Sequence, residues 1–202
     1  MIGIIDYGSG NLMSVYNAFK YLGQDVRVCG KPSELDIADK IVLPGVGSSR
    51  AAMDCLSEKG LLDAIIGAIK KGKNFLGLCL GLQLLLETSE ESGGCDCLGL
   101  FKGTVRLFPG NMGLKVPHMG WNTVGFGKRD CPIFKGIPDN SYFYFVHSYY
   151  CDNRDEAITA GVTGYGLDFT SAVWDANVFA LQFHPERSQE NGLRILRNFI
   201  EL

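Results

Sequence analysis

The sequence predicts an α/β protein in which helices flank a central mixed, largely parallel sheet. In the first half, short β-branched runs alternate with helical patterns, which is typical of parallel strands joined by helices. In the second half, most runs are extended and are separated by Gly, Pro and Asn. No internal repeat or linker interrupts the pattern, so residues 1–202 are expected to form a single domain.

The expected elements follow one another closely along the chain. In the first half, strands are expected at 3–6, 25–29, 40–44 and 75–79, and helices at 12–22, 51–71 and 80–87. In the second half, strands are expected at 104–108, 121–126, 142–150, 170–174 and 178–183. A final amphipathic helix is expected to present Leu193, Leu196, Phe199 and Ile200 on one face.

Composition and charge exclude several classes of function. Of the 202 residues 46% are hydrophobic, which is enough to bury a substantial core. The net charge of −3, without a long run of Lys or Arg, argues against nucleic acid and anionic membrane surfaces as partners. The start MIGIIDYGSGN lacks the features of a signal peptide, and no segment approaches the ~20 apolar residues of a membrane span. A cytoplasmic protein is therefore expected.

The cysteines and histidines indicate neither disulfides nor a metal centre. Seven cysteines at irregular spacing are typical of reduced thiols, and Cys95 and Cys97 lack the spacing of a zinc knuckle. Two glycine-containing segments fail as nucleotide motifs: 67–74 follows a helix instead of a strand, and 8–11 lacks the third glycine of a dinucleotide fingerprint. No metal or cofactor is expected.

The stretch FLGLCLGLQLL places Cys79 between Gly77 and Gly81, where a strand is expected to meet a helix. A nucleophile at a sharp strand-to-helix turn requires small neighbours, because larger side chains would clash with the tight backbone. The dipole of the following helix would favour a thiolate. The alternative is a buried Cys that only fills the core, which is common for this residue type.

A thiolate nucleophile also needs a general base, and His184 is the strongest candidate among the three histidines. It ends the run VFALQF, Pro185 stops the strand, and Glu186 follows within reach of the imidazole. A carboxylate there could fix the ring tautomer and stabilise the imidazolium. His118 and His147 lack such a partner and are interpreted as substrate-side or interface residues.

The reaction further requires N–H donors for the oxygen that becomes negative during attack. One is the backbone N–H of Leu80, the residue after the nucleophile. The second is expected from the segment 40–47, where Pro44, Gly45 and Gly47 break a strand, although the segment could also be a simple turn.

Five motifs, LPGVG, GLCLGLQLL, VPHMGWN, FVHSYY and QFHPE, occur in this order, and with the opening DYGSGN they resemble class I glutamine amidotransferases over nearly the whole chain. The resemblance is greatest to their glutaminase subunits that work with a cyclase. It implies a triad of Cys79, His184 and Glu186, and an oxyanion hole formed by the backbones of Val46 and Leu80. The residues that it implies for glutamine binding are Gly45, Gly47, Gln83, His147, Ser148 and Tyr149.

The resemblance also implies a partner, because the ammonia released from glutamine must reach an acceptor. That partner would be a cyclase subunit of (β/α)8 form in a heterodimer that makes imidazole glycerol phosphate and an aminoimidazole carboxamide ribotide for histidine biosynthesis. The residues that it places near the interface are Asn11, His118, Met119, Trp121, Asn122 and Arg187. Arg187 departs from the Lys that is common in the family, which could alter an interface ion pair.

Two alternatives stay open at the level of sequence. A paralogous subunit would keep the glutaminase chemistry and deliver ammonia to a sugar in surface-polysaccharide synthesis. A cysteine hydrolase on the same fold would share Cys79 and His184 but not the glutamine-binding segments.

Overall fold

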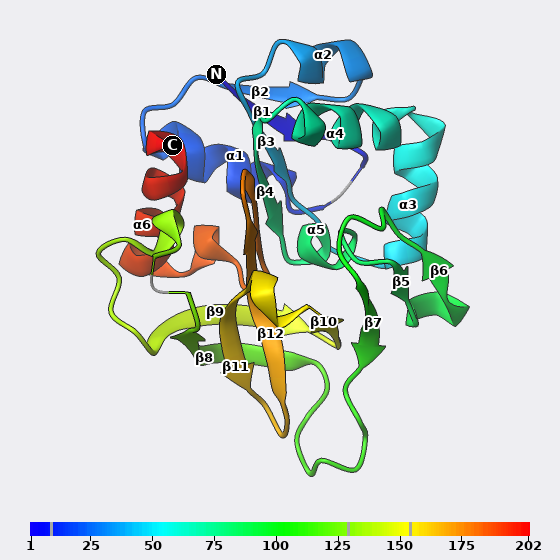
Figure 1. The fold of residues 1–202 in the computed structure, drawn as a ribbon, viewed down its shortest axis with the longest axis vertical. Coiled ribbons are helices and arrows are strands. Elements are labelled where there is room, and N and C mark those ends of the chain that lie inside the picture. The colour runs from blue at the N-terminus through cyan, green and yellow to red at the C-terminus, as the bar shows by residue number, and fades with distance from the viewer. Residues whose placement is uncertain (9, 129, 154) are drawn as a thin grey trace.

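In the computed structural model, which describes residues 1–8, 10–128, 130–153 and 155–202, helices lie on both faces of a large mixed sheet (Figure 1). The first half comprises β1 Ile2–Ile5, α1 Leu12–Tyr21, β2 Val26–Cys29, α2 Pro32–Asp36, β3 Lys40–Leu43, α3 Ser49–Glu58, α4 Leu61–Lys70, β4 Asn74–Leu78, α5 Leu80–Gln83, β5 Thr88–Ser89, η1 Glu91–Gly93 and β6 Cys95–Asp96. The second half comprises β7 Gly103–Leu107, β8 His118–Phe126, η2 Pro132–Phe134, β9 Ser141–His147, β10 Tyr149–Asn153, η3 Glu156–Ile158, β11 Thr159–Gly164, β12 Asp168–Asp175, β13 Val178–Leu181, η4 Pro185–Arg187 and α6 Gln189–Glu201.

The predicted mixed sheet is confirmed, and its two halves differ in strand direction. The strand order is β2-β1-β3-β4-β13-β12-β10-β7-β5-β6, with β11 beside β12 and β8, and with β9 beside β8. Strands β2, β1, β3, β4 and β13 pair in parallel, as does the short pair β5 and β7, whereas the other pairs are antiparallel. Strand β13, which belongs to the second half of the chain, therefore pairs with β4 of the first half on one side and with β12 on the other.

The parallel pairing brings three strand ends to one edge of the sheet. Leu78 of β4 lies opposite Leu181 of β13, and Gly77 lies opposite Leu43 of β3. Because the carboxyl ends of parallel strands share an edge, the loops that follow these strands meet there. Residues separated by about a hundred positions in sequence thus become neighbours.

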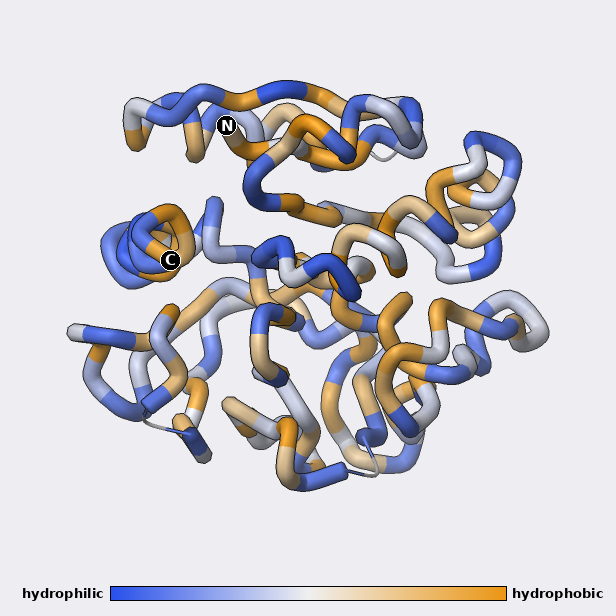
Figure 2. Tube along the Cα trace, turned by 45° about the horizontal axis from the view of Figure 1, so that its top comes forward, coloured by the Kyte–Doolittle hydropathy of each residue, from blue (hydrophilic) through white to orange (hydrophobic). Residues whose placement is uncertain are grey.

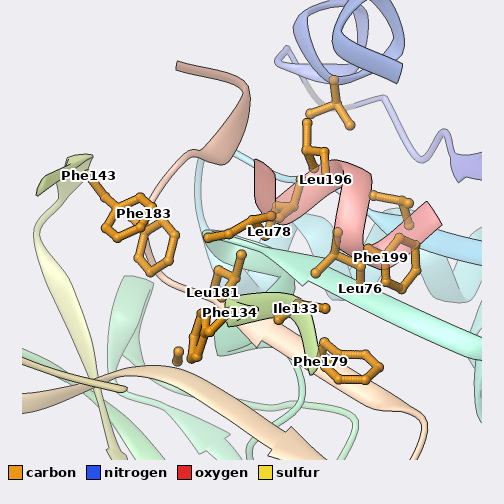
Figure 3. Packing of buried hydrophobic residues seen from close by; sticks show 14 of the residues in the cluster. Leu76, Leu78, Ile133, Phe134, Phe143, Phe179, Leu181, Phe183, Leu196 and Phe199 are labelled. Atoms are coloured by element: carbon orange, nitrogen blue, oxygen red, sulfur yellow. The ribbon is translucent and has the colours of Figure 1, made fainter. Parts of the chain in front are cut away.

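Each face of the parallel strands has its own hydrophobic core, because successive strand residues point to opposite faces. Leu76 and Leu78 pack in one core with residues of α1 and α6, whereas Phe75 packs in the other with residues of α2, α3 and α4. Figure 3 shows the first core around β4, β13 and α6. Complete burial of one such side chain contributes about 1.5–3 kcal/mol.

The predicted amphipathic face of the last helix is confirmed. In α6, Leu196 and Phe199 are fully buried, and Leu193 and Ile200 are half-buried. The prediction omitted Ile195, which is also fully buried. Hydrophilic residues gather on the outer side of this helix, which Figure 2 shows nearly end-on at the C-terminus.

Several predicted boundaries differ from the structure. The helix expected at 51–71 is two helices, because Gly60 adopts a left-handed conformation with φ of 65° between them. The strand expected at 142–150 is interrupted at Ser148. The prediction missed α2, β5, β6 and β11, of which β5 and β6 have only two residues each. The glycine-containing turn at 8–11 includes Ser9, which lies outside the described residues.

Within the described part of the chain, no helix is both long enough and apolar enough to cross a membrane.

Candidate active site

Cys79 lies at a strained elbow directly after β4. Its backbone has φ of 52° and ψ of −103°, which a residue other than Gly adopts only at a cost of about 1–3 kcal/mol. Its N–H donates to the carbonyl of Leu181 at 2.7 Å, so β13 holds the elbow in place. Strain of this kind is common at functional sites and is typical of a nucleophile elbow.

The two flanking glycines allow the elbow to pack closely. A Cβ atom added at Gly77 would lie 2.7 Å from the carbonyl oxygen of Gly81, and one added at Gly81 would collide with the carbonyl oxygen of Leu43. The predicted requirement for small residues on both sides of Cys79 is therefore confirmed. Strand β3 approaches the elbow closely enough to contribute to the same site.

The helix after the elbow is shorter than predicted. It ends at Gln83 instead of 87, because the carbonyls of Leu84, Leu85 and Leu86 accept hydrogen bonds from the N–H groups of residues 98, 101 and 99, at 2.9 Å each. These contacts replace further helical turns. The dipole predicted to favour a thiolate therefore comes from only about one turn of helix.

His184 and Glu186 form a buried pair close to the elbow. The side chain of His184 is 1% exposed and that of Glu186 is fully buried, and Nδ1 of His184 lies 2.8 Å from Oε1 of Glu186. Asn11 Nδ2 donates to the same carboxylate oxygen at 2.8 Å. Among the described residues, Nε2 of His184 has no hydrogen-bond partner, so this nitrogen is available to the sulfur of Cys79 or to a substrate.

The charges of this site oppose the effect of burial. Burial lowers the pKa of His184, but attraction to the Cys79 thiolate and to the Glu186 carboxylate raises it to about 10. Burial raises the pKa of Glu186, but hydrogen bonds from His184 and Asn11 hold it below its usual range. The favoured state of His184 is therefore an imidazolium, which can protonate a leaving group.

The glycine loop after β3 lies beside the elbow. A Cβ atom at Gly45 would collide with Tyr7 Oη and would lie 2.9 Å from Cβ of Leu80, so only glycine permits this approach. The N–H of Leu80, one of the predicted oxyanion donors, donates to the carbonyl of Gly45 at 3.4 Å. Val46 is 37% exposed, and Gly47 has a φ of 98°.

A pocket of about 310 Å³ opens at the elbow, within the size range of small-molecule sites. The residues that line it are Val46, Gly47, Cys79, Leu80, Gln83, Glu91, Pro117, Val146, His147, Ser148 and Tyr149. The structure thus brings together the predicted nucleophile, both residues of the predicted oxyanion hole and five of the six predicted substrate residues. Gly45, the sixth, is not among the lining residues.

Sequence reasoning missed Glu91 in this wall. Its Oε2 accepts hydrogen bonds from the backbone N–H of Ser49 at 2.6 Å and from the hydroxyl of Ser49 at 3.1 Å. These contacts fix an acidic side chain at the start of α3, facing the pocket. No signal in the sequence distinguishes Glu91 from the neighbouring acids Glu87 and Glu90, because only the fold places it there.

The other two histidines contact each other, because His118 of β8 lies opposite His147 of β9. Nδ1 of His147 lies 2.8 Å from the carbonyl of Tyr149, so it carries the proton, and Nε2 of His147 is the acceptor for Nδ1 of His118 at 2.9 Å. Asn122 Nδ2 then donates to His118 Nε2 at 3.2 Å. Burial lowers the pKa of His118 to about 4 and that of His147 to about 3.

The predicted interface residues divide into exposed and buried groups. Met119 is 61% exposed, Trp121 is 46% exposed and Arg187 is exposed, which agrees with a surface role. Asn11 and His118 are each only 3% exposed, so their side chains serve hydrogen bonds within the chain instead. Asn122 is half-buried.

Comparison with known proteins supplies independent findings. The sequence model of the family described as glutamine amidotransferase class-I matches residues 3–202. A protein of Syntrophotalea carbinolica named imidazole glycerol phosphate synthase subunit HisH is 49% identical over 204 residues, which cover 98% of each chain. A protein of Methanothermobacter thermautotrophicus with the same name is 50% identical over 203 residues, which cover 100% of this chain and 98% of the other.

Solved structures of more distant proteins share the fold. The structure of PurLQS from Thermotoga maritima has a TM-score of 0.80 at 20% identity, and the match covers 99% of this chain and 97% of that chain. A second chain, described as a glutamine amidotransferase, has a TM-score of 0.76 at 19% identity, covering 99% of this chain and 97% of that chain. At these identities the likeness concerns the fold alone.

Proposed function

The chain belongs to the class I glutamine amidotransferase family, and on that premise we propose that it hydrolyses glutamine to glutamate and ammonia through a cysteinyl thioester. The observation that carries this proposal is the buried pair of His184 and Glu186 beside Cys79, which itself lines the pocket. A buried imidazolium at this place serves no packing purpose, since an apolar side chain would avoid the cost of burying charge.

The proposed chemistry has two steps. The thiolate of Cys79 attacks the side-chain amide carbon of glutamine, and the imidazolium of His184 gives its proton to the departing nitrogen, so that ammonia leaves and a thioester forms. Water then attacks the thioester, with His184 as the base, and glutamate leaves as the thiol is restored. Glu186 holds the ring by its bond to Nδ1 and stabilises the charged form.

The proposed oxyanion hole requires one local change. In the described conformation the carbonyl of Gly45 accepts a hydrogen bond from the N–H of Leu80, so this N–H is not free to bind an oxyanion. Because the carbonyl and N–H of a trans peptide point in opposite directions, rotation of the peptide between Gly45 and Val46 would free Leu80 and turn the N–H of Val46 toward the site. Each donor gained would contribute about 2.7–4 kcal/mol to the transition state.

We assign the amino-acid end of glutamine to the wall formed by Gln83, Glu91 and residues 147–149. Both N–H groups of Gln83 are engaged, with the carbonyl of Tyr149 at 2.9 Å and with Gln182 Oε1 at 3.1 Å, so its own oxygen is what it can offer to a ligand. That oxygen and the carboxylate of Glu91 suit an ammonium group.

The ammonia acceptor is proposed from the names of the relatives, which denote a synthase subunit. We propose that residues 1–202 form one domain, cytoplasmic in location, that binds a cyclase of (β/α)8 form as a heterodimer and supplies ammonia for histidine biosynthesis. Exposed Met119 and Trp121 of β8 and exposed Arg187 are the proposed contacts, with Arg187 Nη2 donating to Asn11 Oδ1 at 3.3 Å. The near-complete match to subunits of that synthase favours this acceptor over a sugar.

The test measures glutamate release by the chain alone and with a cyclase subunit. Replacing Cys79 with Ala should lower release by about 10⁴-fold or more in both conditions. Cys55→Ala is the matched control, because that thiol is also free but does not line the pocket, and it should retain activity. Glutamate release by the folded Cys79→Ala protein would refute Cys79 as the nucleophile. A rate of glutamate release that the cyclase does not change, together with the absence of a complex, would refute the cyclase as the partner.

A further inference from the structure

Gln182 is a buried polar residue to which neither the mechanism nor the pocket wall assigns a role. It follows β13 directly, is fully buried, and its backbone N–H donates to the carbonyl of Ser171 at 2.9 Å. Its side chain reaches between two residues of the site. Nε2 lies 3.6 Å from the sulfur of Cys79, and Oε1 lies 3.1 Å from Nε2 of Gln83.

The orientation of this amide follows from the backbone carbonyl of Tyr149. A carbonyl can only accept, so the group of Gln83 that lies 2.9 Å from it must be the NH2 group. The same nitrogen faces Gln182, which must therefore present its oxygen to it. The remaining group of Gln182, which faces Cys79, is then the NH2 group, and the sulfur is the acceptor.

From this geometry we propose that Gln182 positions the sulfur of Cys79 and stabilises it as a thiolate by donating an N–H to it. The inference rests on the proposed function in that it takes Cys79 as the nucleophile. A donor to the sulfur favours the charged form over the thiol, because a thiolate accepts a stronger hydrogen bond. With the helix after the elbow only four residues long, a side-chain donor is an effective source of this stabilisation.

The hydrogen bond from Gln182 also restricts the position of the Cys79 sulfur. Gln182 is held at its backbone by β12 and at its oxygen by Gln83, so its NH2 group has little freedom to move. The sulfur thus contacts a fixed amide and also interacts with the imidazole of His184. A fixed donor limits rotation of the Cys79 side chain, which would reduce the loss of freedom needed for attack on a bound amide.

The titratable groups around Cys79 are His184 with Glu186, His147 and Glu91 in the pocket region, and Cys151 of β10. Burial, and then the charge of Cys79, raise the pKa of Cys151, so it stays a thiol and does not compete for alkylating reagents. His147 is neutral because burial lowers its pKa to about 3. The pH profile of Cys79 reactivity therefore reports mainly on the sulfur and on His184.

The experiment measures the rate at which iodoacetamide alkylates Cys79 between pH 5 and pH 10, with mass spectrometry of the Cys79 peptide. In Gln182→Leu the midpoint of the profile should rise by about one pH unit, so that alkylation slows by roughly tenfold at pH values below both midpoints. The value of kcat should fall more than KM rises, since the amide contacts the sulfur and not the substrate. Gln182→Glu should raise the midpoint further, because it puts a negative charge beside the sulfur.

Asn198→Leu is the matched control. Asn198 is 7% exposed and donates to the carbonyls of Ile133 and Lys135 at 2.9 and 2.8 Å, so its loss removes two buried amide hydrogen bonds away from the pocket. This control should lower the melting temperature and leave the alkylation profile unchanged. Gln182→Glu keeps an oxygen for Gln83 and decides the question if Gln182→Leu does not fold.

An unchanged midpoint in a folded Gln182 variant would overturn the inference. Failure of the proposed function would appear in a different measurement. Wild-type protein in which Cys79 has been alkylated would then still release glutamate, whatever alkylation profiles the Gln182 variants show.

Discussion

His184 and the pair formed by His118 and His147 are similarly buried, yet His184 is charged at neutral pH and the other two histidines are neutral. The residues are 1%, 3% and 6% exposed, respectively. The pKa of His184 is raised to about 10, whereas the pKa values of His118 and His147 are lowered to about 4 and about 3. Burial disfavours the charged imidazole in each case, so the difference comes from the partners.

The partners explain which histidine can act in catalysis. His184 has the carboxylate of Glu186 and the sulfur of Cys79 beside it. His118 and His147 have each other and the carbonyl of Tyr149, and His118 stacks on the rings of Phe145 and Tyr165 at centroid distances of 4.8 and 4.0 Å. The neutral pair therefore fixes tautomers and shapes the pocket wall, while the charged residue can move a proton.

The largest effect is expected from removing the negative charge of Glu186, which helps to raise the pKa of His184. Glu186→Gln keeps the size of the side chain but not its negative charge, so kcat/KM should fall by roughly 10³-fold, or about 4 kcal/mol. The pKa of His184 should fall as well, measured by the pH dependence of its imidazole NMR signals. A His184 pKa that stays near the wild-type value would show that Cys79 alone sustains the imidazolium.

A second test follows from the lowered pKa values of His118 and His147. In the unfolded chain a histidine binds a proton near pH 6.5, but in the folded chain these two bind it only below about pH 4. Their stabilisation is therefore complete above pH 6.5 and is lost as the pH falls toward 4. Between pH 6.5 and pH 5 the free energy of unfolding should drop by roughly 1.6 kcal/mol for each histidine.

Denaturant titrations at several pH values measure this slope. Well below pH 6.5 His184 is protonated in both the folded and the unfolded chain, so it adds little to the slope. His118→Phe, which suits the surrounding aromatic rings, should halve the slope. A slope that is the same in this variant would mean that the pair is already protonated in the folded state.

The smallest effect is expected from Asn11, which directly precedes α1 and donates a hydrogen bond to Glu186. Asn11→Ala removes the hydrogen bond to Glu186 Oε1 and should cost about 1 kcal/mol, or a five- to tenfold fall in kcat, with His184 still charged at neutral pH. Asn177→Ala is the control, because the side-chain amide of Asn177 also donates hydrogen bonds, to the carbonyls of Ile69 and Lys73, away from the site. Equal loss of kcat in both variants would contradict a specific role for Asn11.

Much of the fold could be predicted because its signals are local. Alternating apolar runs and helical patterns predicted the parallel strands and the last helix, since each element must bury one face. The boundaries that failed depend on long-range contacts. The helix after Cys79 stops at Gln83 because the loop at 98–101 supplies donors to its carbonyls, and no pattern within 80–87 indicates that loop.

For the candidate site, the sequence by itself determined the chemistry that is available: a cysteine between glycines, and a histidine followed by an acid two residues later. These features are readable because steric limits and carboxylate–imidazole contacts act over a few neighbouring positions. Tertiary structure alone decided that Gln182 faces the sulfur, that Glu91 faces the pocket and that Gly45 occupies the N–H of Leu80. Those contacts depend on the register of β3, β4 and β13, which is set by packing across the whole sheet.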